Sequence, residues 1–301
     1  MYHYRAFGVN IASEFQLPEL MISDGIEDVR IISGAVPEKI ENFKSEGVCY
    51  QAAPGVFLLN IKDVARFLVS KGNEIVIQPY PNSLEEDIRL FLLGSAFGAL
   101  LHERGYLPFH GSVINFKGKG IIFSGVSGSG KSTLAGSFQK RGYPVLSDDV
   151  AIISMDAEQK PIVHPSYPQI KLWKDSLLKL GGTPEEHRKV RSKLDKYGVL
   201  LHSGYFNENL PLAAIYIIVA LNSGSDRIET ITGIEKFNAL RKNTYRYTYL
   251  SGLDLNARHL MSCTKIAPFI QVKKLTRNTG TFSLDKFTEL VENDILSWLG
   301  N

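Results

Sequence analysis

The first part of the chain has the pattern of short strands. Runs of β-branched and aromatic residues at 29–32, 55–61, 65–69 and 74–78 are separated by glycine, proline, asparagine and aspartate, which favour turns. Runs of this length are typical of strands, because a helix needs a longer apolar stripe to cover a core. We therefore predict a β-rich region over residues 1–82.

A longer, helical pattern follows this region. Ser83 and Glu86 have the spacing of a capping box at a helix start. Apolar residues then recur with the helical period as far as about residue 102. We place a domain boundary here, so the sequence predicts a β-rich domain at 1–82 and a second domain at 83–301.

The second domain alternates strands with helices. Two apolar strands, at 106–116 and 121–123, are joined by a tight turn, so we expect them to pair antiparallel. The wholly apolar run 210–221 predicts a strand in the centre of a sheet. Further strands are predicted at 228–232 and 269–275, and helices at 233–240, 253–261 and 285–299. The predicted fold class is α/β.

The middle of this domain carries less distinct patterns. Residues 165–173 are irregular and aromatic, and they either line a substrate groove or form the edge of the core. A second capping-box sequence at 183–186 predicts a helix over 187–196. Its basic side chains form either a solvated face or a lid over phosphates or an acidic substrate. They are Arg188, Lys189, Arg191, Lys193 and Lys196.

Composition places the chain among soluble globular proteins. Of its 301 residues, 44% are hydrophobic and 22% are charged, and the net charge is +3. So small a charge, without a basic stripe, argues against a nucleic-acid partner. The apolar runs are too short to span a bilayer and the N-terminus has no signal region, so we expect no membrane association. Two cysteines, Cys49 and Cys263, lack C-x-x-C spacing, which argues against a zinc site and favours the reducing cytoplasm.

The strongest chemical signal is a phosphate-binding loop (P-loop). Residues 125–132, Gly-Val-Ser-Gly-Ser-Gly-Lys-Ser, match G-x-x-x-x-G-K-[ST] in full and lie between an apolar strand and a helix. Backbone N–H groups and the helix N-terminus would bind phosphate oxygens, and glycines let the backbone approach them. A glycine-rich turn that binds nothing is the alternative. We expect ATP or another nucleoside triphosphate to bind through Gly125, Ser127, Gly128, Ser129, Gly130, Lys131, Ser132 and Thr133.

Two neighbouring acids, Asp148 and Asp149, end the short apolar strand after the P-loop helix. One carboxylate at such a place can hold Mg²⁺ together with the Ser132 hydroxyl, while Lys131 neutralises the β- and γ-phosphates. The other can take a proton from an attacking hydroxyl. Adjacent side chains on an extended backbone point to opposite sides, which is compatible with two roles. An Asp-Asp turn without a catalytic role is the alternative.

His110-Gly-Ser, the loop at 125–132 and Asp148-Asp149, in this order and spacing, resemble the HPr kinase/phosphorylase family. Residues 4–14 and the β-rich first third are similar to HPr-kinase-like proteins of lasso-peptide biosynthesis, which phosphorylate the precursor peptide on a C-terminal serine. The resemblance implies a sheet related to that of phosphoenolpyruvate carboxykinases. It also implies that Asp148 is the general base, that His110 hydrogen-bonds it and that Asp149 is the metal-side acid.

The sequence therefore predicts an α/β P-loop kinase with an N-terminal β-rich domain. It would transfer the γ-phosphoryl group of a nucleoside triphosphate, with Mg²⁺, to a hydroxyl, in particular the C-terminal serine of a peptide. An NTP-hydrolysing switch or sensor and a small-metabolite kinase stay open. Residues 275–280 only echo the late proline- and arginine-containing signature of the bifunctional enzymes, so neither phosphorylase activity nor HPr as the substrate is implied. An oligomer is compatible with the sequence.

Overall fold

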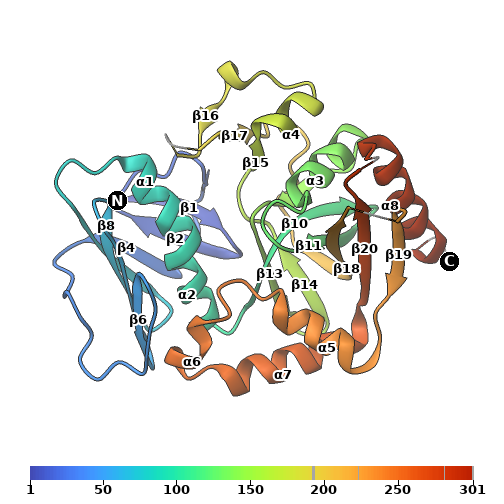
Figure 1. The fold of residues 1–301 in the computed structure, drawn as a ribbon. Coiled ribbons are helices and arrows are strands. Elements are labelled where there is room, and N and C mark those ends of the chain that lie inside the picture. Colours follow the sequence, from blue (N-terminus) through green and yellow to red (C-terminus); the bar gives the residue numbers. More distant parts are fainter. Residues whose placement is uncertain (192–193, 223, 281, 300–301) are drawn as a thin grey trace.

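In the computed structural model, which describes residues 1–301 except 192–193, 223, 281 and 300–301, a β-rich part and a mixed part lie side by side (Figure 1). Across its described residues the β-rich part is one sheet of order β3-β1-β2-β4-β9-β8-β7-β6-β5. β4 is parallel to β2 and β9, and the other pairs are antiparallel. The strands are β1 (Tyr2–Ala6), β2 (Val9–Ser13), β3 (Met21–Ile22), β4 (Val29–Ser33), β5 (Ser45–Glu46), β6 (Tyr50–Ala53), β7 (Val56–Ile61), β8 (Ala65–Ser70) and β9 (Glu74–Pro79).

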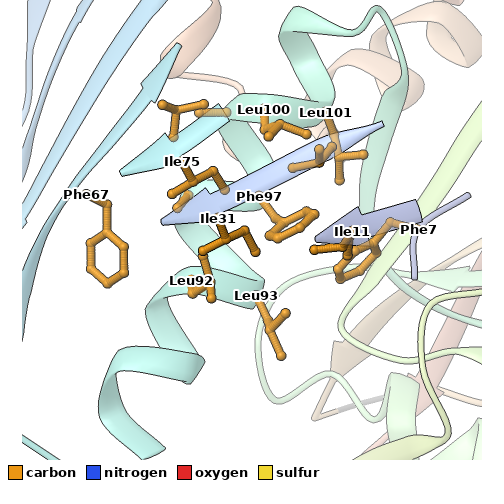
Figure 2. Close-up of a cluster of buried hydrophobic side chains, with 14 of the residues drawn as sticks. Phe7, Ile11, Ile31, Phe67, Ile75, Leu92, Leu93, Phe97, Leu100 and Leu101 are labelled. Carbon is orange, nitrogen blue, oxygen red and sulfur yellow. The ribbon is translucent and has the colours of Figure 1, made fainter. Parts of the chain in front are cut away.

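A bent helical segment covers one face of this sheet. It consists of α1 (Glu85–Phe91), the π-helical turn η1 (Leu92–Ala96) and α2 (Phe97–Glu103). Figure 2 shows its apolar side chains, Phe97 among them, beside Phe7 and the sheet residues Ile31 and Ile75. Burial of this apolar face holds the segment in place.

The predicted capping box at Ser83 is wrong. The cap position is Leu84, and no side chain caps the helix. Ser83 instead lies in the preceding turn, where its N–H donates to the Tyr80 carbonyl. Negative charge at the helix N-terminus stabilises the helix through its dipole, and it comes from Glu85, Glu86 and Asp87.

The mixed part contains the sheet that carries the P-loop. Among the described residues its order is β11-β10-β13-β14-β18-β20-β19, with β12 beside β10 and a further pairing of β11 with β18. β10 and β11 form the predicted antiparallel hairpin, and β18 lies between β11 and β20, parallel to both. The strands are β10 (Leu107–Phe116), β11 (Lys119–Ser124), β12 (Val145–Ser147), β13 (Val150–Met155), β14 (Pro161–His164), β18 (Leu210–Leu221), β19 (Arg227–Thr230) and β20 (Gln271–Asn278).

Helices cover both faces of this sheet, which confirms the predicted α/β class (Figure 1). Neighbouring side chains of β11 point to opposite faces of the sheet. Phe123 packs in the buried cluster that includes α3 and α8, and Ile122 packs in the cluster that includes α5 and α7. The predicted helix 253–261 is wrong in its bounds, because Asp254 adopts a left-handed φ of 61° and separates α6 from α7. The helices are α3 (Lys131–Lys140), α5 (Gly233–Lys242), α6 (Tyr249–Leu253), α7 (Asn256–Ile266), η3 (Ala267–Phe269) and α8 (Leu284–Leu299).

The predicted helix over 187–196 is also wrong. Residues Pro184–Glu186 form only a 3₁₀ turn, η2, and the chain then enters β16 and β17 of a small sheet of order β15-β17-β16. Pairing of β16 with β17, which in turn pairs with β15, decides this conformation, because backbone bonds across a sheet override a weak local preference for helix. Of the basic side chains, Lys193 lies outside the described residues. The elements are β15 (Gln169–Trp173), α4 (Lys174–Lys179), β16 (Arg188–Lys189) and β17 (Lys196–Leu200).

The core of the β-rich part extends past residue 83. The helical segment 85–103 belongs to it, and so do Val150, Ile152 and Tyr167 from the mixed part. The domain boundary between residues 82 and 83 stays a prediction. Among the described helices, none is long and apolar enough to cross a membrane.

Candidate functional site

The P-loop lies between β11 and α3, and its glycines adopt conformations that other residues disfavour. Gly125, Gly128 and Gly130 have φ values of 139°, 80° and 104°. A Cβ at Gly125 would lie 2.6 Å from the carbonyl oxygen of Ile218, so the parallel neighbour β18 leaves no room for a side chain. The sequence motif therefore has the strand–loop–helix context that a phosphate cradle needs.

Lys131 lies buried across this loop. Its ammonium donates hydrogen bonds to the carbonyl oxygens of Gly125 and Val126, each at 2.9 Å. Burial lowers the pKa of Lys131 to about 8, although the carboxylates of Asp149 and Asp148 oppose the shift. The cation is thus held at the loop, where a phosphate oxygen would be a stronger partner than the two carbonyls.

Other predicted loop residues have separate environments. Among the residues that the structure describes, the buried Ser129 hydroxyl has no hydrogen-bond partner, so a polar ligand would relieve an unsatisfied group. Ser127 is exposed at the loop tip. Thr133 donates to the Ser176 hydroxyl in α4 at 2.8 Å, which directs its side chain to a structural contact.

Asp148 is buried and fully hydrogen-bonded. Its Oδ1 accepts from the Ser132 hydroxyl at 2.8 Å and from the Ser112 hydroxyl at 2.5 Å. Its Oδ2 accepts from the backbone N–H of Lys171 at 2.7 Å. Asp148 therefore lies against the hydroxyl that the P-loop motif reserves for Mg²⁺.

Asp149 lies beside a different set of side chains, Lys171 and His110. Its Oδ2 is 3.2 Å from Lys171 Nζ, and its Oδ1 is 3.7 Å from His110 Nδ1. His110 Nδ1 also donates to the Asp149 backbone carbonyl at 3.0 Å. Burial would raise the pKa of the Asp149 carboxyl, but Lys171, Lys196 and His110 outweigh it and hold that pKa well below its usual range.

The structure thus brings His110 to Asp149, whereas the resemblance implied a contact with Asp148. It also places the two carboxylates beside one face of β10, because His110 and Ser112 are two residues apart and each contacts one acid. The expected opposite orientation fails because Asp149 is not extended: its φ of 74° is left-handed. Burial, and then the charge of Lys131, lower the pKa of His110, so its imidazole is neutral at pH 7.

Two residues that sequence reasoning did not single out complete the site. Lys171 is buried and joins the acids, with its N–H on Asp148 and its ammonium on Asp149. Arg277 of β20 lies against the P-loop, since a Cβ at Gly130 would come within 2.8 Å of its Nη1. Its Nε has no hydrogen-bond partner in the described part of the chain, and its Cζ lies 4.9 Å from the centre of the Phe282 ring. In the sequence, only the aromatic segment around Lys171 and the late arginine within 275–280 pointed toward these two residues.

The donor set fits Mg²⁺ with a bound nucleotide. The Ser132 hydroxyl and the Asp148 carboxylate are hard oxygen ligands side by side, which Mg²⁺ prefers. The described residues contain no cluster of three or more metal-ligating side chains. Phosphate oxygens and water would complete the coordination, as is usual for this ion.

A cleft of about 660 Å³ lies near the two acids, which do not themselves line it. Lys171 lines it and also contacts Asp149. Both segments that the sequence suggested as a groove or a lid line this cleft. Tyr167 and Lys171 come from the first segment, and Arg188 and Lys189 from the second.

No family model matches the chain. The chain is 38% identical to an HPr kinase/phosphorylase of Chlorobaculum tepidum over 58 residues. This segment covers 19% of this chain and 17% of that protein. A second HPr kinase/phosphorylase, of Pelodictyon phaeoclathratiforme, is 38% identical over 53 residues, 18% of this chain and 16% of that protein. The chain thus matches about a sixth of the length of these relatives.

Among solved structures, the Hpr(Ser) kinase/phosphatase of Coxiella burnetii aligns with 64% of this chain and 99% of its own. The sequence identity is 14% and the TM-score 0.34, too low to support an argument. The two curated relatives confirm the predicted resemblance, and over this short segment the chain is homologous to HPr kinase/phosphorylases.

Proposed function

We propose that the chain is a Mg²⁺-dependent kinase that transfers the γ-phosphoryl group of a nucleoside triphosphate to a serine hydroxyl of a peptide. The observation that carries the proposal is the meeting of three groups at one edge of the sheet. These are Lys131 across the P-loop, the Ser132–Asp148 pair, and the Asp149–His110 pair. The homologous segment shared with HPr kinase/phosphorylases supports the same reaction class.

The nucleotide half of the site is built from the P-loop. Its N–H groups would bind the phosphates, and Lys131 would exchange its two carbonyl contacts for phosphate oxygens. Ser132 and Asp148 would hold Mg²⁺, which supplies charge neutralisation at the β- and γ-phosphates. Arg277, whose guanidinium lies against Gly130, would add a second cation near the transferred group.

In the acceptor half we assign the base to Asp149, in place of the sequence-based assignment to Asp148. Asp148 is occupied by three donors, whereas Asp149 faces His110 and Lys171 and is partly exposed. Asp149 would orient the acceptor hydroxyl and take its proton as the oxygen bonds to the γ-phosphorus. The bond from that phosphorus to the β–γ bridging oxygen breaks, and the nucleoside diphosphate leaves with the electron pair.

His110 and Lys171 are positioning residues in this scheme. His110 holds the Asp149 peptide through its carbonyl. Lys171 keeps the carboxylate ionised, because its ammonium stabilises the charged form. Phosphoryl transfer depends mainly on positioning and electrostatics, so a base of low pKa is compatible with it.

The peptide and its serine are the finer part of the proposal. They are supported by the resemblance to lasso-precursor kinases and by the size of the cleft beside Asp149. A nucleotide-driven switch would need only water at this position, and a metabolite kinase would need less space.

The test uses the whole chain with Mg-ATP and a library of short peptides that are randomised except for a terminal serine. Mass spectrometry should show one added phosphate on these peptides and none on a matched library ending in alanine. ATP alone should be hydrolysed slowly. Rapid hydrolysis without an acceptor would favour the switch, and phosphorylation of small alcohols but of neither library would favour the metabolite kinase.

A further inference from the structure

The cleft beside the acids has walls from both parts of the molecule. Pro18, Glu19 and the α1 residues Glu86, Arg89 and Leu90 line it from the β-rich part. β15, β16 and β17 line it from the small sheet of the mixed part. Nothing in the proposed phosphoryl transfer uses the first of these walls.

A contact between the two walls bridges the cleft. Arg191, just after β16, lies 3.5 Å from the Asp87 carboxylate, and its guanidinium lies 5.7 Å from the Phe91 ring. Arg191 thereby attaches the end of β16 to α1. Because the bridge is one partly exposed ion pair and one ring contact, it can open at low cost.

β16 presents an unpaired edge to this cleft. It pairs with β17 on one side, and among the described residues no strand lies on its other side. Val190 donates its N–H to the Lys196 carbonyl, and Lys189 lies opposite Tyr197. Since bonded and non-bonded pairs alternate in an antiparallel ladder, the N–H and C=O of Lys189 point away from β17.

The charges of the cleft fit a peptide backbone better than a polyanion. Arg89 is paired with Glu19, Lys189 with Asp195, and Lys171 with Asp149. Three of the four Lys and Arg residues that line the cleft, all but Arg188, are therefore paired with carboxylates, and apolar side chains such as Leu90 lie among them. A nucleotide or polyphosphate would need unpaired cations, whereas an extended peptide needs backbone partners and small apolar contacts.

We propose, resting on the function proposed above, that the acceptor peptide docks in this cleft as a strand added to the free edge of β16. Lys189 would exchange backbone hydrogen bonds with it, and Leu90 of α1 would contact its side chains. The peptide would run toward Lys171, which lines the cleft and bonds Asp149, so that its serine arrives at the base. The β-rich part then serves as one wall of the acceptor site.

Two variants test the two walls. Lys189→Pro removes the outward N–H, and Lys189→Ala keeps this donor, so the difference between the two variants measures the backbone contact apart from the side chain. Leu90→Glu places a charge in the cleft, and Leu84→Glu is its control at an exposed α1 flank outside the cleft. The readout is the rate of phosphate incorporation into the serine-ending library at low peptide concentration, with the thermal shift caused by Mg-ATP as a measure of folding and nucleotide binding.

Lys189→Pro and Leu90→Glu should lower the rate by about tenfold or more, as expected for one or two lost hydrogen bonds or a lost apolar contact. Lys189→Pro should be slower than Lys189→Ala, the Leu84→Glu control should match the parent, and the Mg-ATP shift should persist in all four variants. Equal peptide rates in the parent and Leu90→Glu would overturn the docking cleft, even if Lys189→Pro does not fold. If the parent phosphorylates no peptide at all, the proposed function itself fails.

Discussion

Replacing Asp149 with asparagine tests which acid receives the proton. The change keeps the shape of the side chain and removes its negative charge and its basicity. The introduced amide oxygen could still accept the hydrogen bond from Lys171, and the hydrogen bond from His110 to the backbone carbonyl of residue 149 would be unchanged. Nucleotide and Mg²⁺ binding should persist, because Ser132 and Asp148 are untouched.

The expected loss follows from the contacts of Asp149. A positioned base contributes about 10²- to 10⁴-fold in rate, which is about 3–5 kcal/mol of barrier. The variant also leaves the Lys171 ammonium buried without a carboxylate. Breaking a buried ion pair costs about 3–5 kcal/mol of folding stability, and the 24% exposure of the Asp149 side chain places the cost near or below the lower end.

The assay compares Asp149→Asn with Asp148→Asn. For each variant we would measure turnover on the serine-ending peptides and the Mg²⁺ concentration that half-saturates the ATP-dependent thermal shift. Asp148→Asn should raise that Mg²⁺ concentration by about tenfold or more, since a charged ligand becomes neutral. If Asp149→Asn keeps turnover within about tenfold while Asp148→Asn loses it at unchanged Mg²⁺ affinity, our reassignment of the base is refuted.

The remaining predictions concern four further sites. Lys131→Ala should lower turnover by about 10²-fold or more and abolish the Mg-ATP thermal shift, and an unchanged shift would contradict nucleotide binding at the loop. His110→Ala should slow transfer more than it weakens ATP binding; a lower melting temperature with full turnover per folded molecule would indicate a packing role only. Arg277→Ala should cost about 10²-fold in turnover with the fold retained, and parent-like turnover would remove Arg277 from the site. Burial lowers the pKa of His102 and of His259 from 6.5 to about 4. Because these buried rings are neutral in the folded protein, the free energy of unfolding should be highest above pH 6.5 and should fall by up to about 3 kcal/mol per histidine as the pH drops toward 4. A melting temperature that stays constant between pH 6.5 and 4 would contradict this.

Features specified by neighbouring residues were predictable from the sequence. The P-loop is a local motif, because its glycines allow the turn and its lysine and serine follow at a set spacing. The β10–β11 hairpin and the central strand β18 were likewise readable, from a tight turn and from a wholly apolar run. The last helix, α8, was readable from the apolar period of a surface helix, and Phe287, Val291 and Ile295 on one side of it are buried.

Segments with weak local preference were decided by tertiary contacts. Residues 187–196 have the start signal and the charges of a surface helix, yet Arg188 and Lys189 form a strand. The partner that decides this is β17, which is itself ordered by β15. A window of sequence contains no information about such a partner, so the pattern alone favoured the wrong structure.

The chemistry of the two acids shows the same division. Their position after the P-loop helix was enough to predict an Mg²⁺ site and a base, because that chemistry needs carboxylates at the end of such a strand. Which acid meets Ser132 and which meets His110 depended on the left-handed backbone at Asp149 and on the register of β10 against β13. Lys171 and Arg277 reach the site from distant strands. The sequence by itself determined the kinds of groups in the site, and only the tertiary structure decided which of them touch, since contacts between distant segments depend on how the whole chain packs.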